Sequence, residues 1–243
     1  MLDRLRVVLV STRNPLNIGA AARAMSNFGF TSLRVVAPYD VAFREARSAV
    51  GASHLLQNAE EFRELPDAIA DCLLVVGTTA AKARQLLHPL KLLEEGSAEI
   101  RRKLAAGPVA LLFGSEKRGL SKNDLSYCHW LMRIPTAETN VSMNLGQAVA
   151  VCLYEFARTA EISPASAEFS GADAAQLERM TQAFFEALVA SGYVKPGAGT
   201  VSLEKARRLV RRMNLSGEDA ETWTGALAKM GLMLRRKDHA GKD

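Results

Sequence analysis

Short, almost wholly apolar runs alternate along the chain with segments of helical periodicity. The apolar runs cover residues 6–10, 33–37, 72–76, 109–113 and 131–134. Such runs are typical of strands buried on both faces of a parallel sheet. The helical patterns between and after them cover residues 20–28, 43–50, 59–71, 95–106 and 142–158. This alternation predicts an α/β fold, a parallel sheet with helices on both of its faces.

Polar residues gather where three of the predicted strands end. Residues 115–118 follow one strand and residues 136–144 another, and a Gly-Thr-Thr-Ala turn at 77–80 ends a third. Ligands of open parallel sheets bind at this carboxyl edge. Taken alone, the turn at 77–80 fits an ordinary strand-to-helix connection better than a ligand loop. Its place at a strand's carboxyl end keeps a ligand site open as an interpretation.

Capping residues mark the ends of two predicted helices. We expect Asn17 to cap the helix at 20–28 and Gly29 to end it in a left-handed conformation. Ser142 and Asn144 stand at the start of the last helical pattern of this region, and capping is the role that the residues by themselves favour. A strand, a loop and a helix N-terminus in succession also form a corner that suits anions.

The loop after residue 113 invites comparison with a nucleotide-binding P-loop. Gly114 and Gly119 stand five apart after a strand, but Leu120 occupies the position where that motif requires lysine. The chain has no G-x-G-x-x-G after any predicted strand. These departures exclude nucleoside triphosphate hydrolysis and argue against a dinucleotide site.

Composition limits the class of protein further. The formal net charge of +5 and pI near 9.2 permit an anionic partner such as RNA, although solubility explains them equally well. Cys72, Cys128 and Cys152 lie far apart, and the four histidines form no ligand-spaced cluster. We therefore expect a reducing compartment and no metal site. No apolar run has the length of a signal-peptide core or a membrane span, so a cytoplasmic protein is expected.

The last third of the chain has a different character. Residues 161–172 are small, polar and without pattern, which indicates a linker. Helical patterns follow at 173–191, 202–213 and 217–236. We therefore divide the chain into a domain at 1–160, the linker, and a small, basic helical domain at 173–243.

The middle helix of that domain carries a dense basic sequence. Ala206, Leu209, Val210 and Met213 have the spacing of a buried stripe. That assignment leaves the arginines on the other faces, where phosphates of RNA would neutralise them; a solvated helix surface is the alternative. The predicted RNA-binding residues are Arg207, Arg208, Arg211 and Arg212.

Three blocks of sequence together resemble the SpoU branch of the SPOUT RNA methyltransferases. They are N-I-G-A-A-A-R at 17–23, F-G-S-E-K-R-G-L at 113–120, and I-P-T-A-E-T-N-V-S-M-N-L at 134–145. Each block falls at a predicted strand-to-helix junction, and their order makes the match specific. The resemblance covers nearly the whole chain and is strongest before residue 160.

The resemblance implies a homodimer whose sheet ends in a trefoil knot that holds S-adenosylmethionine. Periodicity alone would never suggest a knot, because knots are rare. It implies 2′-O-methylation of a ribose in RNA, for which we expect tRNA nucleotide 32, a cytidine or uridine of the anticodon loop. Ribosomal RNA is the alternative substrate. A non-catalytic RNA-binding dimer is the alternative from another class, and the intact catalytic motif speaks against it.

The motif also carries residue roles onto this sequence. The implied catalytic residues are Asn17, Arg23, Glu116, Ser142 and Asn144. The implied cofactor-binding residues are Thr78, Thr79, Ala80, Gly114, Ile134, Val141, Ser142, Met143 and Leu145. Arg23 is the family's candidate base, but a guanidinium gives up its proton poorly, so clamping a phosphate or the developing alkoxide is an equally good role.

Overall fold

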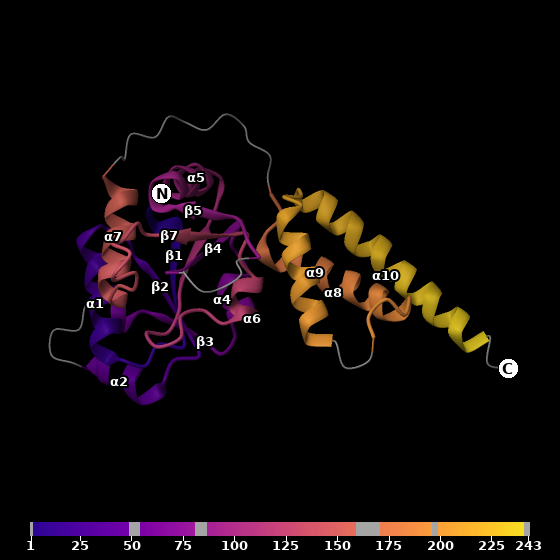
Figure 1. The fold of residues 1–243 in the computed structure, drawn as a ribbon, viewed down its shortest axis with the longest axis horizontal. Helices are drawn as coiled ribbons and strands as arrows, with labels where there is room; N and C mark the ends of the chain where they lie inside the picture. Colours follow the sequence, from indigo (N-terminus) through magenta and orange to yellow (C-terminus); the bar gives the residue numbers. More distant parts are fainter. Residues whose placement is uncertain (1, 49–53, 81–86, 159–170, 196–198, 241–243) are drawn as a thin grey trace. The chain divides into compact units, whose positions relative to one another are not determined.

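The apolar runs pair into a sheet of seven parallel strands in the order β3-β2-β1-β6-β4-β7-β5 (Figure 1). The structure is a computed structural model that describes residues 2–48, 54–80, 87–158, 171–195 and 199–240. The strands are β1 (Leu5–Val10), β2 (Ser32–Val36), β3 (Glu60–Phe62), β4 (Leu74–Thr78), β5 (Leu90–Leu92), β6 (Val109–Phe113) and β7 (Trp130–Arg133).

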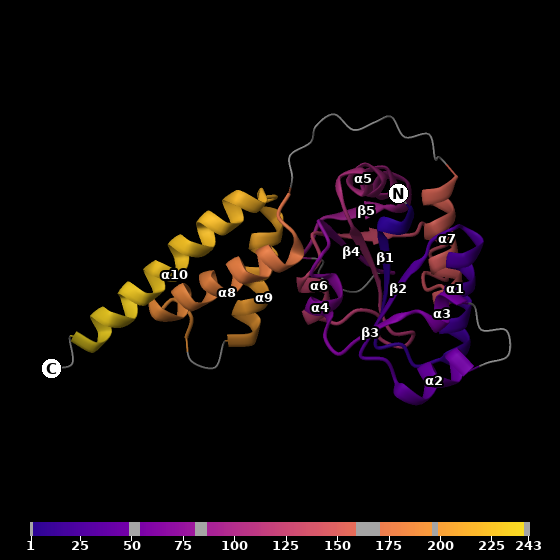
Figure 2. The same ribbon diagram turned by 180° about the vertical axis from the view of Figure 1, so that it is seen from behind.

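Helices connect the strands and cover both faces of the sheet (Figures 1 and 2). A 3-10 turn, η1 (Leu2–Arg4), precedes β1. The connecting helices are α1 (Pro15–Asn27), α2 (Asp40–Ser48), α3 (His54–Gln57), α4 (Leu65–Ile69), α5 (Leu93–Ala106), α6 (Lys122–Ser126) and α7 (Leu145–Ala157). Figure 1 shows α1 and α7 on one side of the sheet and α4 and α6 on the other.

The strand register explains why the central strands are apolar throughout. Val7 pairs with Leu33 on one side and Leu111 on the other, so all three point to the same face, where α1, α5 and α7 complete the core. The alternate residues Val8 and Leu112 point to the opposite face and are also fully buried. Because both faces are covered, neither position tolerates a polar side chain. The predicted α/β sheet with helices on both faces is confirmed, and the knot stays a prediction.

Local predictions failed in two places. The pattern at 59–71 predicts a helical segment interrupted at Pro66, but Glu60–Phe62 forms the edge strand β3, and α4 begins only at Leu65. The predicted N-cap of the first helix is also wrong, because α1 begins at Pro15 and Asn14 accepts the capping hydrogen bond from Leu16 N at 3.0 Å. The predicted left-handed end of that helix is confirmed, since Gly29 has φ 77°.

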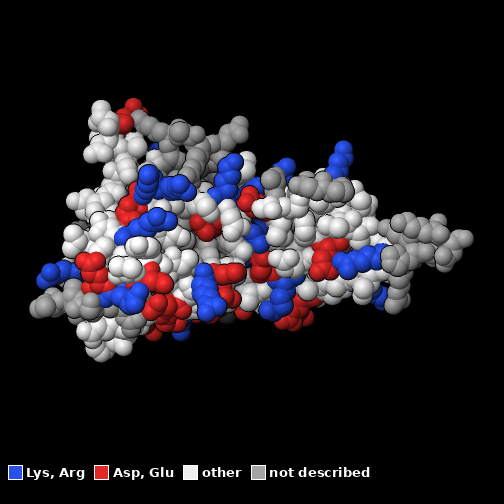
Figure 3. Space-filling view, turned by 90° about the horizontal axis from the view of Figure 1, so that it is seen from below, with Lys and Arg blue, Asp and Glu red and all other residues white. Residues whose placement is uncertain are grey.

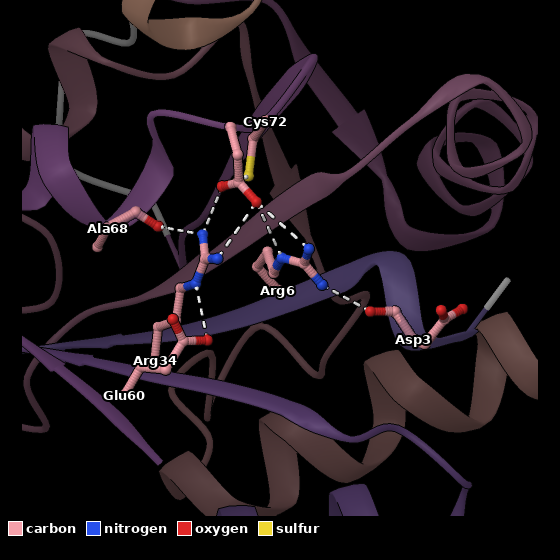
Figure 4. A network of polar contacts seen from close by, with 7 residues as sticks. Asp3, Arg6, Arg34, Glu60, Ala68 and Cys72 are labelled. Atoms are coloured by element: carbon pink, nitrogen blue, oxygen red, sulfur yellow. Dashed lines mark hydrogen bonds and ion pairs between the residues drawn. The ribbon is translucent and has the colours of Figure 1, made fainter. Parts of the chain in front are cut away.

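A charged network ties the amino ends of β1 and β2 to the turn before β4 (Figure 4). Asp71 accepts hydrogen bonds from Arg34 Nη1 at 2.5 Å and Nη2 at 3.2 Å, and from both Nε and Nη2 of Arg6 at 3.3 Å. Arg34 is 8% exposed, lies over the Phe62 ring, and also contacts Glu60 and the carbonyl oxygen of Ala68. The buried guanidinium therefore has acceptors on three sides.

The same network sets the titration of Asp71. Burial by itself raises the pKa of this carboxyl, but hydrogen bonds and positive charge from Arg34 outweigh burial, and the pKa lies below its ordinary value. The neighbouring Cys72 thiol has a raised pKa, first because it is buried and second because it adjoins the Asp71 carboxylate. Cys72 is therefore a protonated core residue.

The second unit, Phe169–Asp243, is a helical cluster with its own core. It contains α8 (Ala174–Ala190), α9 (Gly199–Arg212) and α10 (Gly217–Ala240). Asp173 and Gln176 form a capping box at the start of α8. Residues 161–170 of the predicted linker lie outside the described residues. Ala172, its last residue, is buried and donates from its backbone to Leu215 O at 2.8 Å, so it belongs to the helical cluster.

The predicted exposed face of α9 is wrong. Arg207, Arg208 and Arg211 are 3%, 8% and 2% exposed, whereas Leu209 and Met213, predicted to be buried, are 43% and 46% exposed. The reason lies on α8, where the Glu178 carboxylate accepts hydrogen bonds from Arg207 and forms an ion pair with Arg211. Arg211 also donates to the carbonyl oxygen of Ala174.

Burial changes what these arginines can do. A guanidinium that already has a carboxylate partner inside the helical cluster is not available to a phosphate on the surface. Of the four predicted RNA-binding arginines, only Arg212 is exposed. Within the described residues, no helix is long and apolar enough to span a membrane.

Candidate active site

A cavity of about 370 Å³ opens at the carboxyl ends of β4, β6 and β7. Three loops that lie far apart in the sequence meet there: the end of β4, the loop between β6 and α6, and the loop between β7 and α7. Hydrogen bonds join the strand ends, from Thr78 Oγ1 to Leu112 O at 2.8 Å and from Thr79 N to Met132 O at 3.0 Å. The cavity therefore lies where parallel sheets bind ligands.

The β6–α6 loop folds back over its own start. Gly119 N donates to Ser115 O at 2.7 Å, and Gly119 has φ 66°, a conformation that suits glycine. A Cβ atom at Gly114 would lie 2.1 Å from both Gly119 C and Leu120 N. Gly114 is thus required by the close approach of two backbone segments, which form one wall of the cavity.

Every residue that the family resemblance assigned to the cofactor lines this cavity. Gly114 comes from the β6–α6 loop, and Ile134 and Met143 come from the β7–α7 loop, yet all three line it. Glu116, Ser142 and Leu145 also line it, together with the turn at 78–80 and Val141. The structure thus brings these side chains together, and their roles toward a cofactor stay predictions.

A chain of hydrogen bonds connects three of the implied catalytic residues. Asn144 Nδ2 donates to Asn17 Oδ1 at 2.7 Å, and Asn17 Nδ2 donates to Glu116 Oε1 at 3.0 Å. Because a carboxylate only accepts, Asn17 must turn its NH₂ toward Glu116 and its oxygen toward Asn144. Asn144 then turns its own oxygen to the N-terminus of α7, where Gly146 N donates to it at 2.9 Å. The orientation of each amide group is therefore fixed by its hydrogen-bond partners in this chain.

Glu116 also holds the loop before α1. Its carboxylate accepts hydrogen bonds from the backbone N–H groups of Arg13 and Asn14, each at 3.4 Å. Within the described residues, no cation forms an ion pair with Glu116. The exposed Glu116 carboxylate therefore lines the cavity, where Lys117 and Arg118 supply positive charge from the same loop.

The N-terminal turns of α1 and α7 pack closely behind this chain. A Cβ atom at Gly146 would lie 2.5 Å from the Cβ of Ala20. The missing side chain lets the two helices approach until Asn17 and Asn144 meet. Arg23, two turns further along α1 than Asn14, is exposed and is not among the residues that line the cavity. Of the five implied catalytic residues, it is the one that this chain does not bring to the others.

Sequence reasoning missed part of the cavity wall. Phe113 ends β6 there, Met132 lies near the end of β7, Leu120 comes from the β6–α6 loop, Leu125 from α6, and Ala148 from α7. The signal for Phe113 was present, because it is the last apolar residue before a polar loop. Apolar Ile134 follows Met132, so no such signal marked Met132. The described residues contain no group of His, Cys, Asp and Glu able to hold a metal ion.

Comparison with known proteins defines the class. Residues 4–154 match the SpoU rRNA Methylase family, so the chain belongs to the SpoU methylase family. The matched segment contains every residue of the cavity and of the hydrogen-bond chain.

Individual relatives extend the likeness to both units. The chain is 32% identical over 237 residues to a tRNA (cytidine/uridine-2′-O-)-methyltransferase TrmJ of Sodalis glossinidius, covering 95% of this chain and 92% of the relative. A TrmJ of Klebsiella pneumoniae is 33% identical over 240 residues, covering 95% and 97%. The crystal structure of TrmJ from Z. mobilis ZM4 matches with a TM-score of 0.80 at 30% identity, over 93% of this chain and 98% of that one.

Proposed function

We propose that this protein transfers the methyl group of S-adenosylmethionine to the 2′-hydroxyl of a cytidine or uridine ribose in tRNA, at nucleotide 32 of the anticodon loop, in the cytoplasm. The observation that carries the proposal is the meeting of two motif-bearing loops and the turn after β4 at one cavity, with the chain Asn144–Asn17–Glu116 beside it. The likeness to TrmJ enzymes over nearly the whole chain supports the tRNA substrate.

The cavity fits the proposed cofactor in size and chemistry. Its volume lies within the range of small-molecule sites. Apolar walls from Met132, Ile134 and Leu145 suit an adenine ring, and the hydroxyls of Thr78 and Ser142 suit polar ends. Bound S-adenosylmethionine supplies a methyl group on a positively charged sulfur.

The protein's own residues then have to place a ribose. Asn17 and Asn144 hold each other and the starts of α1 and α7, so they fix the wall against which the sugar lies. Glu116 fixes the loop before α1 against the cavity. Positioning of this kind accounts for a large part of the rate in transfer reactions. In the transfer, the 2′-oxygen would take the methyl group, the sulfur would keep the electron pair of the broken bond as a neutral thioether, and the hydroxyl proton would pass to solvent water. Arg23 would supply a permanent positive charge that stabilises the negative charge developing on the 2′-oxygen.

Arg23 is exposed and lies outside the lining of its own chain's cavity, so we propose that a second subunit supplies it and include a homodimer in the proposal. The test mixes two variants that are each expected to lose most of their activity, Arg23→Ala and Glu116→Gln. A composite site predicts that the mixture regains activity, because some dimers join an intact Arg23 to an intact Glu116. A mixture that stays inactive, while sedimentation shows mixed dimers, contradicts the shared site. Arg23→Lys keeps the charge and loses the planar fork, so activity near that of the unchanged protein excludes a bidentate role.

The reaction is tested with labelled cofactor and either bulk tRNA or ribosomal RNA, followed by alkaline digestion. A 2′-O-methyl group blocks the hydroxyl that attacks the neighbouring phosphate, so we expect label from tRNA in alkali-resistant dinucleotides. Label in mononucleotides contradicts ribose methylation and indicates base methylation. Label in ribosomal RNA alone contradicts the tRNA substrate and leaves the chemistry intact. Mapping the resistant linkage tests nucleotide 32.

A further inference from the structure

β1 and β2, which are neighbours in the sheet, both end in a strained backbone. Ser11 follows β1 with φ 52°, and Ala37 follows β2 with φ 42°. Left-handed conformations are unfavourable for residues with a Cβ atom, and they persist where surrounding contacts fix them. Such contacts are present here: Ser11 N donates to Val36 O at 2.9 Å, and Ala37 N donates to Phe62 O at 2.9 Å.

The strained turn after β2 presents an aromatic side chain. Tyr39 is 56% exposed, and its backbone is held at both ends: its N–H donates to Thr12 O at 3.3 Å, and its carbonyl oxygen accepts from Phe43 N at 3.0 Å. Pro38 before it restricts the backbone further. Hydrogen bonds thus fix the backbone that carries this mostly solvated ring, and the core of this unit does not require the ring.

The position of Tyr39 connects it to the active site. Thr12, its backbone partner, adjoins Arg13, whose own N–H donates to Glu116 at the cavity. Arg13 has an exposed side chain. In the sheet, β2 lies two strands from β6, which corresponds to roughly 10 Å at the usual strand spacing. The nucleotide next to one that is bound at the cavity lies within this distance of the bound nucleotide.

The carboxyl ends of the strands face the side on which α2 lies in Figure 1, and Figure 3 views the molecule from that side. Basic and acidic side chains are interspersed on the visible surface, with no continuous basic patch. RNA that binds at this edge therefore needs specific contacts in addition to general electrostatic attraction. Proteins recognise single-stranded loops by stacking unpaired bases on aromatic rings and by pairing arginine with phosphate.

We propose that Tyr39 and Arg13 form a docking platform for the RNA loop that carries the target ribose. Tyr39 stacks on an unpaired base beside the target nucleotide, and Arg13 pairs with a phosphate. This inference rests on the proposed function and adds where the substrate lies: along the ends of β1 and β2. The other occupant of such a surface is a second copy of this chain, which the test below separates.

The test compares Tyr39→Leu, which keeps an apolar side chain without an aromatic face, with Tyr39→Phe, which keeps the ring. We expect Tyr39→Leu to raise the KM for tRNA by roughly tenfold or more, the size of a lost base stack. Tyr39→Phe keeps KM within about twofold, since stacking needs no hydroxyl. Arg13→Gln lowers the slope of log affinity against log salt by about one, as for one lost phosphate contact. Binding of S-adenosylmethionine stays unchanged in all three variants.

Three outcomes overturn the platform. Tyr39→Leu with unchanged KM shows that the ring does not contact RNA. A shift of Tyr39→Leu toward monomers in sedimentation assigns the surface to a second copy instead. Equal loss in Tyr39→Leu and Tyr39→Phe contradicts stacking. The proposed function fails on a different result, namely that the unchanged protein neither binds nor methylates tRNA. If the unchanged protein is active and the Tyr39→Leu variant is equally active, only the platform is contradicted.

Discussion

Two carboxylates of the first unit each collect several N–H donors, one before the amino end of β4 and one after the carboxyl end of β6. Asp71 receives the guanidinium groups of Arg6 and Arg34 (Figure 4). Glu116 receives two backbone N–H groups and the Asn17 amide. The number of donors is similar, but those of Asp71 belong to cationic side chains, whereas those of Glu116 among the described residues are neutral.

That difference separates stability from function. The network of Asp71 joins cations to anions and leaves little charge for a ligand. Among the described residues, the network of Glu116 uses neutral backbone and amide donors, so it holds the loop before α1 at a cavity that Lys117 and Arg118 also line. The same chemical group can thus fasten a fold at one end of a sheet and prepare a site at the other, depending on what donates to it.

The largest expected effect comes from Glu116→Gln. The amide has one accepting oxygen, so it cannot keep all three donors, and the loop before α1 shifts relative to the cavity. Small misplacements of this kind cost about 100-fold in rate. We expect that loss in single-turnover methylation, with a urea midpoint unchanged from the unaltered protein. A variant that is fully active, or one that loses activity only because it unfolds, contradicts a positioning role.

A smaller effect is expected from Gly146→Ala. Its new methyl group would overlap Ala20 and push α1 from α7, separating Asn17 from Asn144. We expect activity to fall roughly tenfold, as a misplacement smaller than that in Glu116→Gln. The control is the double variant Ala20→Gly with Gly146→Ala, which moves the methyl group to the other helix. Recovery of activity in the double variant supports the account, and no recovery contradicts it.

Asp71→Asn is the matched change at the other end of the sheet. We expect a loss of about 1 kcal/mol in the free energy of unfolding, because Asp71 is partly exposed and solvent screens its ion pairs. Activity at 25 °C stays unchanged. The folded pKa of Asp71 lies below its ordinary value of 3.8, so this stabilisation is present above about pH 4 and is lost as pH falls through the folded pKa. Urea unfolding at pH 7 and pH 3 measures the difference in the free energy of unfolding between the unchanged protein and Asp71→Asn. A difference that is larger at pH 3 than at pH 7 contradicts this role of Asp71.

The smallest effect concerns the second unit. Arg212 is exposed on α9, and Arg212→Glu should weaken tRNA binding by about threefold through loss of a phosphate contact. The contrasting variant is Arg211→Glu, which places a second carboxylate beside Glu178 in the helical core and should unfold the unit instead. Circular dichroism separates the two outcomes. Unchanged tRNA affinity in Arg212→Glu removes this residue from the RNA contact.

Local sequence signals determined the central sheet and failed at its edges. Nearly every residue of β1 and β6 is apolar, as expected for strands that are covered on both faces, and such runs can be recognised from the sequence alone. β3 and β5 are three-residue edge strands that contain charged residues, so no periodicity marks them. The start of α1 was readable, because Asn14 followed by Pro15 is a common cap signal.

The site required more than periodicity. Residues of the cavity come from segments separated by many residues, and two of the three motif blocks mark only the loops after β6 and β7. The error on α9 has the same origin, because Glu178, the partner that buries Arg207 and Arg211, lies on another helix. A helix examined alone does not show which of its charged side chains another helix will neutralise.

The central claim is that three distant loops form one cofactor site, and amide hydrogen exchange measures it most directly. On addition of S-adenosylmethionine to the full chain, we predict slower exchange at residues 78–80, 114–120 and 134–145 together. Amides of the network around Asp71 should exchange at unchanged rates. Slowing in only one of the three segments, or in none of them while the cofactor binds, would contradict the site.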